Sequence, residues 1–134
     1  MPREGAAVKE IAFALEIKDD PEAIRAYRDW HQKVWPEIMQ GTAALGVIAQ
    51  NIYLVGNRLF MVLQVEDDFD YRRDFARYLE EVPRAKDWEA LMQNYQRQLP
   101  WSAEDVWWTP MERVYDLNAC LLYTSDAADD YFWV

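Results

Sequence analysis

Cysteine, histidine and glycine are all scarce in this chain of 134 residues, which contains one, one and four of them. A single cysteine, Cys120, cannot form an intrachain disulfide. One histidine also falls short of the three or four His, Cys or carboxylate ligands of a typical zinc or iron site. The glycines stand apart from one another, so no glycine-rich phosphate loop is present. We therefore expect a protein that uses neither a metal nor a nucleotide cofactor.

Positive charge and long apolar runs are lacking as well. The chain has 14 Lys and Arg against 24 Asp and Glu, a net charge of −10. A nucleic-acid backbone needs a basic face, so this balance argues against nucleic-acid binding and against an anionic membrane surface. No apolar run approaches the roughly 20 residues of a membrane-spanning helix. We expect a soluble, cytoplasmic protein with no nucleic-acid or membrane partner.

The last residues differ in character from the rest. Residues 120–129 resemble one reading frame of a transposase adapter used in sequencing libraries, so we predict that 118–134 are a non-native or disordered tail. This tail contains Cys120 and three Asp but no Lys or Arg, so the remainder stays acidic and has no cysteine. Residues 1–117 then have the length and the apolar content of one globular domain.

Alternating apolar residues and turn signals predict the order of the elements. Asp20 followed by Pro21 is typical of a helix start. Gly56-Asn57 is typical of a tight hairpin turn between two antiparallel strands. We predict strands at 9–17, 47–55, 58–65 and about 106–115, with helices at about 20–34, beyond Pro36, about 70–81 and after Pro83.

This order, βαββαβ, predicts an α+β fold of the ferredoxin-like type, with helices on one face of an antiparallel sheet. The other face of such a sheet also needs a cover. A second copy of the chain is the most economical one, so we expect a homodimer that closes sheet on sheet as a dimeric α+β barrel.

The first helix carries the candidate chemistry on its inward face. Ile24, Tyr27, His31, Val34 and Ile38 recur at spacings of three and four residues, which places them on the side that packs on the sheet. The phenol of Tyr27 lies one turn before His31. Any acid–base chemistry by an imidazole near neutral pH must use His31. The alternative is a histidine that only packs in the core.

The segment that contains Tyr27, His31 and Trp35-Pro36-Glu37 resembles the signature of the L-rhamnose mutarotase family. Residues 51–54, 87–88 and 111–117 resemble later blocks of the same family, in order and at matching spacing. The resemblance spans about residues 9–117. The segments 51–61 and 88–92 look more like the branch of the family assigned to L-fucose.

The resemblance implies a ferredoxin-like dimer that interconverts the α and β anomers of a deoxy-hexose, L-fucose or L-rhamnose, without a cofactor. It implies that His31 is the proton donor and that Tyr27 contacts the sugar. Gln50 stands where the family has a sugar-contacting tyrosine, and Asp87 replaces the first of two paired tryptophans, which leaves Trp88 as the second. We expect Gln50, Asp87 and Trp88 to contact the substrate, although Asp87 also suits a helix start and Trp88 a core.

Mutarotation needs only a positioned acid and base, and an imidazole suits this task without tuning. Asp87, Tyr27 or a bound water remain open as the base. A cofactor-independent monooxygenase or haem-binding protein of the same architecture is an alternative, with His31 as base or ligand. A ligand-binding or dimerisation module without catalysis is another, because fold does not determine function.

Overall fold

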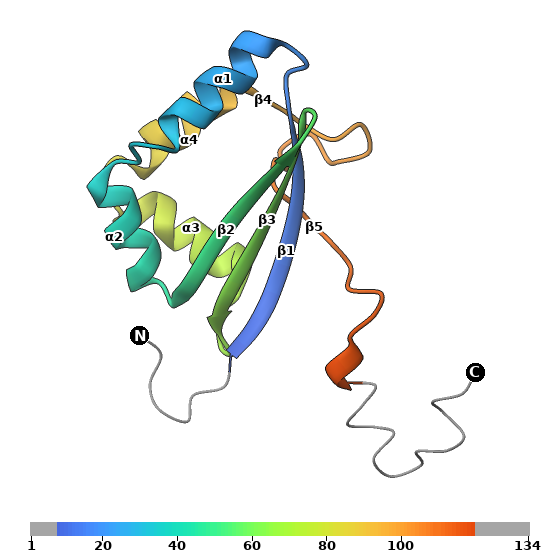
Figure 1. Ribbon diagram of the computed structural model, residues 1–134. Coiled ribbons are helices and arrows are strands. Elements are labelled where there is room, and N and C mark those ends of the chain that lie inside the picture. The colour runs from blue at the N-terminus through green and yellow to red at the C-terminus, as the bar shows by residue number, and fades with distance from the viewer. Residues whose placement is uncertain (1–7, 120–134) are drawn as a thin grey trace, which may run out of the picture.

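The computed structural model describes residues 8–119, in which four helices lie on one side of a strongly twisted sheet (Figure 1). Residues 120–129, for which we predict a foreign origin, fall outside this range. The elements are, in chain order, β1 (Val8–Ile17), α1 (Pro21–Trp30), α2 (Pro36–Ala44), β2 (Val47–Val55), β3 (Arg58–Glu66), α3 (Tyr71–Glu81), α4 (Ala85–Gln93), β4 (Gln96–Arg97) and β5 (Thr109–Pro110).

The sheet is antiparallel, with strand order β2-β3-β1-β4 and with β5 also paired to β1. This is the order expected for a ferredoxin-like fold, and the three longer strands agree with the predicted ranges to within one residue. The hairpin between β2 and β3 turns at Gly56, whose φ of +58° favours glycine. The opposite end of β2 carries a register irregularity between Val47 and Ala49.

Alternate residues of the strands face the helices and form the core. Phe13, Leu15 and Ile17 of β1 are fully buried, and β3 contributes four further buried residues, Leu59, Met61, Leu63 and Val65. This period of two is the pattern of a sheet that is covered on one face. The helices supply the other half of the core through Tyr27, Ile38, Tyr78 and Trp88.

The first helix is shorter than predicted, because α1 ends at Trp30 and not near Val34. The amides of Gln32 and Lys33 donate to carbonyls only three residues back, which closes the helix in a tight turn. Trp35 is extended, as the residue before a proline usually is, and Pro36 then begins α2. The chain therefore changes direction immediately after His31.

The predicted last strand at 106–115 is wrong in its length. Only Thr109 and Pro110 pair with β1, although the amide of Met111 donates one further bond of 2.8 Å to the carbonyl of Ala12. Proline has no N–H for a ladder, and the chain leaves the sheet just beyond it. The unpredicted β4 pairs with another stretch of the same edge, Glu16–Ile17.

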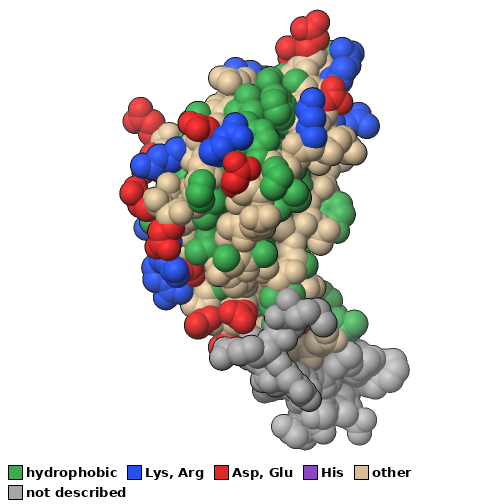
Figure 2. Space-filling model, turned by 90° about the vertical axis from the view of Figure 1, so that its left-hand side faces the viewer, with side chains coloured by type: hydrophobic (Ala, Val, Ile, Leu, Met, Phe, Trp, Pro, Cys, Tyr) green, Lys and Arg blue, Asp and Glu red, His purple; other side chains and the backbone are tan. Residues whose placement is uncertain are grey.

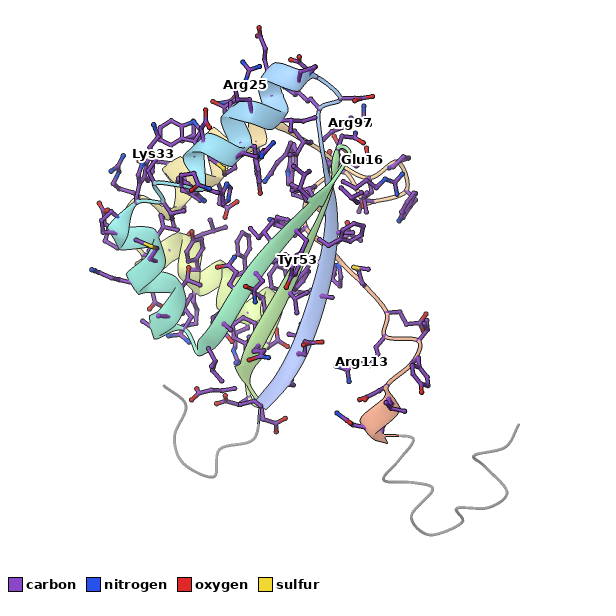
Figure 3. All side chains as sticks on the ribbon, viewed as in Figure 1. Glu16, Arg25, Lys33, Tyr53, Arg97 and Arg113 are labelled. Atoms are coloured by element: carbon purple, nitrogen blue, oxygen red, sulfur yellow. The ribbon has the colours of Figure 1, made fainter. Side chains whose placement is uncertain are left out.

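The buried carboxylate of Glu16 in β1 forms ion pairs with side chains of β3 and β4. Glu16 lies opposite Arg58 and Arg97 in the two registers, and Arg97 donates to it at 2.8–2.9 Å (Figure 3). Arg58 is 3.4 Å away on the other side. A buried carboxylate with two guanidinium partners is adequately neutralised, so this cluster has a structural role at the end of the sheet.

None of the helices among residues 8–119 is long and apolar enough to cross a membrane.

Candidate active site

A cavity of about 370 Å³ lies between the inner face of the sheet and the helices. Its wall is largely apolar and includes Val34, Ile38, Leu45, Ile52, Met61 and Leu63. Met39 and Gln50 also line it and are exposed, so this part of the wall reaches the molecular surface. Figure 2 shows the helical side of the molecule, where apolar side chains run between charged ones. A concave, apolar site with a few polar groups is typical of small-molecule binding.

His31 caps the C-terminus of α1 and lines this cavity. Its Nδ1 lies 2.8 Å from the carbonyl oxygen of Tyr27. A carbonyl can only accept, so Nδ1 carries the hydrogen and Nε2 of the neutral ring is a proton acceptor. Burial lowers the pKa of His31 below its usual 6.5, and the hydrogen bond to Tyr27 offsets part of this shift. The ring is therefore neutral and basic at neutral pH.

Two aromatic side chains hold the imidazole in place. The ring of Tyr27 lies 4.3 Å from that of His31, and the ring of Trp88 meets it edge-on at 5.7 Å. Trp88 also makes edge contacts with Trp30 and Trp35 at 6.4 and 5.2 Å. These geometries are the preferred ones for aromatic pairs. The structure thus places Tyr27, His31 and Trp88 next to one another in the cavity wall.

Tyr27 is almost fully buried, and its phenol is a donor. Burial raises the pKa of Tyr27, as does the charge of Glu89, while the Gln96 side chain acts in the opposite direction. A neutral phenol that is reluctant to ionise makes a poor general base. Tyr27 is therefore better suited to donating a hydrogen bond than to accepting a proton.

Gln50 reaches the cavity from β2, whereas Asp87 does not reach it. The amide nitrogen of Gln50 donates to the sulfur of Met61 at 3.2 Å, so the amide is oriented along the cavity wall. Asp87 lies in the first turn of α4, is exposed and is absent from the cavity wall. Asp87, which we expected to contact the substrate and which remained open as the base, thus lies outside the cavity wall.

The acidic residue of α4 that does line the cavity is Glu89, which is not among the site residues predicted from the sequence. The same holds for Tyr71, Tyr78 and Gln96, which are further polar members of the wall. The sequence does contain a signal for Glu89. Ala85, Trp88 and Met92 mark the inward face of α4, and Glu89 lies four residues after Ala85 on the edge of that face.

No group of three His, Cys, Asp or Glu side chains within the described part of the chain is arranged to hold a metal ion.

Comparison with solved structures supports the fold. A crystal structure of an L-rhamnose mutarotase from Formosa agariphila matches with a TM-score of 0.59 at 22% identity, covering 81% of this chain and 97% of that one. Tetracenomycin F2 cyclase from Streptomyces glaucescens, a type II polyketide cyclase, matches with a TM-score of 0.55 at 13% identity over 81% and 95% of the two chains. At such identities the likeness concerns the fold alone, which is the α+β barrel type that we predict.

Sequence comparison is more specific. A UPF0734 protein of Dictyostelium discoideum is 36% identical over 113 residues, which are 82% of this chain and 90% of that protein. An L-fucose mutarotase of Xanthomonas campestris is 32% identical over 114 residues, 84% and 90% of the two chains. The sequence model of the L-rhamnose mutarotase family matches residues 10–117, the region that contains the whole cavity. The chain therefore belongs to the L-rhamnose mutarotase family of isomerases.

Proposed function

We propose that this protein interconverts the α and β anomers of a deoxy-hexose by general acid–base catalysis at His31. The main support for the proposal is the position of His31. Its Nδ1 is hydrogen-bonded to the backbone carbonyl of Tyr27, and its ring lines the cavity. The family resemblance implies that His31 donates a proton; a neutral imidazole held in this way first accepts a proton at Nε2 and then donates it back to the sugar. Mutarotation requires no more than such transfers to and from the sugar oxygens.

L-Fucose is the substrate we favour, with L-rhamnose second. Each sugar carries one methyl group and several hydroxyls, and the cavity offers both kinds of surface. Its apolar wall suits the methyl group, while Tyr27 and Gln50 provide hydrogen bonds and Trp88 an aromatic edge or face. The similarity to a protein named L-fucose mutarotase supports the same choice.

Saturation-transfer NMR on the anomeric protons tests this proposal directly. The wild-type protein is added to L-fucose, L-rhamnose and D-glucose, and the rate of exchange between the α and β resonances is measured for each. We expect faster exchange for one of the two deoxy-hexoses and little change for D-glucose. Exchange at the spontaneous rate for both deoxy-hexoses would contradict the proposal.

We also propose that the protein is a homodimer in which the outer faces of two sheets meet. Helices α1 to α4 all cover the inner face (Figure 1), while Ala12, Phe60 and Val62 point outward from the two central strands. On β2 the outward Tyr53 is 58% exposed and Val55 is 64% exposed. An uncovered apolar sheet face of this kind is typical of an interface between protomers.

Tyr53→Arg is expected to turn the dimer into a monomer. The side chain is exposed within one protomer, so the arginine is tolerated there, whereas a second sheet packed on it would bury an unpaired charge. Light scattering during size-exclusion chromatography measures the mass against the chain mass of 15.9 kDa. Ala43→Arg, on the exposed side of α2, is the control and should stay dimeric. A wild-type protein that runs as a monomer at all concentrations would rule out this assembly.

A further inference from the structure

Glu89 is a cavity carboxylate to which the chemistry described so far gives no role. It follows Trp88 on α4, and its side chain lines the same cavity as His31. The rings of Trp88 and His31 are 5.7 Å apart, so α4 contacts the C-terminal end of α1 next to Glu89. A carboxyl group and an imidazole therefore line the same cavity.

Among residues 8–119, the side chains that line the cavity with Glu89 include no Lys or Arg. The titratable side chains around the cavity are His31 and Tyr27 from the first helix and Tyr71, Asp74 and Tyr78 from α3. Asp74 is neutralised separately, because Arg73 and Arg77 bind it at 2.9 and 3.2 Å. None of the ion pairs formed among residues 8–119 involves Glu89. Its carboxylate thus lies in a mostly apolar wall without a compensating charge.

This environment changes the proton affinity of Glu89 and of its neighbours. Burial raises the pKa of Glu89 from its ordinary 4.5 to about 7. Burial raises the pKa of Tyr27, Tyr71 and Tyr78, and the charge of ionised Glu89 adds to this effect, so the three phenols stay protonated as donors. At neutral pH the carboxyl group is therefore divided between its acid and its base form, as suits a proton-transfer group.

The arrangement also lowers the stability of the fold. Between pH 4.5 and about 7 the folded protein holds a proton on Glu89 that the unfolded chain has lost. The free energy of unfolding therefore decreases as the pH rises through this interval. A glutamine would avoid this loss and fill the same space. Unfavourable burial of an ionisable group is characteristic of functional sites.

We propose that Glu89 is the second catalytic residue of this site and exchanges one proton with the sugar while His31 exchanges the other. The inference rests on the proposed mutarotase function and deepens it, since it names the acid–base partner of His31. Asp87, the other acidic residue of α4, is exposed and outside the cavity wall. Tyr27 holds its proton too firmly to serve as a base.

The two residues account for every proton in the reaction. On ring opening, the carboxyl group of Glu89 gives its proton to the ring oxygen as the bond from that oxygen to C1 breaks. Nε2 of His31 takes the proton of the anomeric hydroxyl, and the electrons of that O–H bond complete the carbonyl. After the aldehyde turns, the ring-forming hydroxyl adds to its other face and returns its proton to Glu89, while His31 reprotonates the carbonyl oxygen. The enzyme regains its starting state, and only the anomer differs.

Glu89→Gln is the variant that tests this role. It keeps the shape of the side chain and removes its proton chemistry, so anomer exchange should fall by about 10²- to 10⁴-fold. Binding of 1,5-anhydro-L-fucitol, which lacks the anomeric hydroxyl, should change little in calorimetry. The wild-type rate should decline above about pH 7, and the residual rate of the variant should lack this decline. Glu80→Gln makes the same change at an exposed glutamate of α3 that lies outside the cavity wall, so it is the matched control and should keep wild-type exchange.

Folding and titration are measured on the same proteins. Glu89→Gln should unfold at a higher temperature than wild type above pH 7, so lost exchange cannot come from misfolding. In protein with ¹³C-labelled glutamate, the carboxyl signal absent from the variant should titrate near pH 7. A midpoint near the ordinary value of 4.5 would overturn the proposal.

The outcomes separate the two hypotheses. If the wild-type protein is active and the Glu89→Gln variant is equally active, the result contradicts only the catalytic role of Glu89. If the wild-type protein accelerates exchange of neither deoxy-hexose, the result contradicts both the mutarotase function and the role of Glu89.

Discussion

His31→Ala is expected to lower anomer exchange by about 10²- to 10⁴-fold, the contribution of one positioned acid–base group. The sequence has no second histidine that could replace it. NMR exchange on L-fucose and L-rhamnose measures the loss. Added imidazole should restore part of the rate, because the truncated side chain leaves room next to Tyr27 and Trp88. Gln32→Ala, the exposed neighbour, should behave as wild type.

The pH profile provides an independent check on His31. Burial lowers its pKa below 6.5, so the neutral ring persists into mildly acidic solution. As the pH falls through that pKa, Nε2 becomes protonated and the wild-type rate should decrease. Together with the loss above about pH 7 on ionisation of Glu89, this gives a bell-shaped profile. A His31→Ala protein that exchanges anomers as fast as wild type would remove His31 from the mechanism.

If His31 and Glu89 transfer protons in the same reaction step, the effects of substituting them on the activation free energy of anomer exchange will not be additive. Once one proton-transfer partner is lost, the other has little left to contribute. The double variant His31→Ala with Glu89→Gln should therefore be only slightly slower than the slower single variant. A double variant whose loss equals the product of both single losses would indicate independent roles.

Trp88→Ala should destabilise the fold by about 3–5 kcal/mol, the usual range for truncating a buried large aromatic side chain. Trp88 is only 6% exposed and packs against Trp30, His31 and Trp35. Its loss would enlarge the cavity and leave the imidazole without one of its two ring contacts. Urea unfolding monitored by circular dichroism measures the change, and Trp101→Ala is the control, because Trp101 is 68% exposed.

Trp88→Phe separates packing from substrate contact. A phenyl ring retains most of the buried surface, so this variant should lose far less stability than Trp88→Ala. If Trp88 also contacts the sugar, the KM of Trp88→Phe will rise while the fold stays intact. A Trp88→Ala protein as stable as wild type would contradict the core role that its burial indicates.

Much of the fold is predictable because its signals are local. The Asp20 side chain accepts from the amide of Glu22 at 3.2 Å and Pro21 begins the helix, as residue preferences alone suggest. The strands follow from alternation, and Gly56 provides the positive φ of the hairpin. The pairing of Tyr27 with His31 is predictable for the same reason, since residues four apart on a helix are neighbours.

The errors arise where distant segments compete. The edge of β1 is shared between β4 and β5, and no pattern within 106–115 reveals that Gln96 and Arg97 occupy part of it. This pairing is accompanied by the ion pair between Arg97 and Glu16, which lies 81 positions earlier in the chain. A pairing of this kind depends on topology and not on local propensity.

Long-range contacts also explain why Glu89, and not Asp87, lines the cavity. Arg84 adopts a left-handed φ of +67° just before α4, and its guanidinium stacks 3.6 Å from the ring of Trp35 while pairing with Glu37 at 3.7 Å. This contact with another part of the chain accompanies the start of α4 at Ala85. The starting residue determines which acidic side chain turns inward, because each residue along a helix rotates the face by about 100°.

The βαββαβ order, the family and the contact between Tyr27 and His31 can therefore be predicted from the sequence, because each depends on neighbours in the chain or on a contiguous motif. Which carboxyl group shares the cavity with that imidazole depends on how α4 packs in the folded chain. The same packing sets the protonation state that each group favours. The pKa of a side chain depends on how completely water and opposite charge are excluded from it, and that is a property of the packed fold.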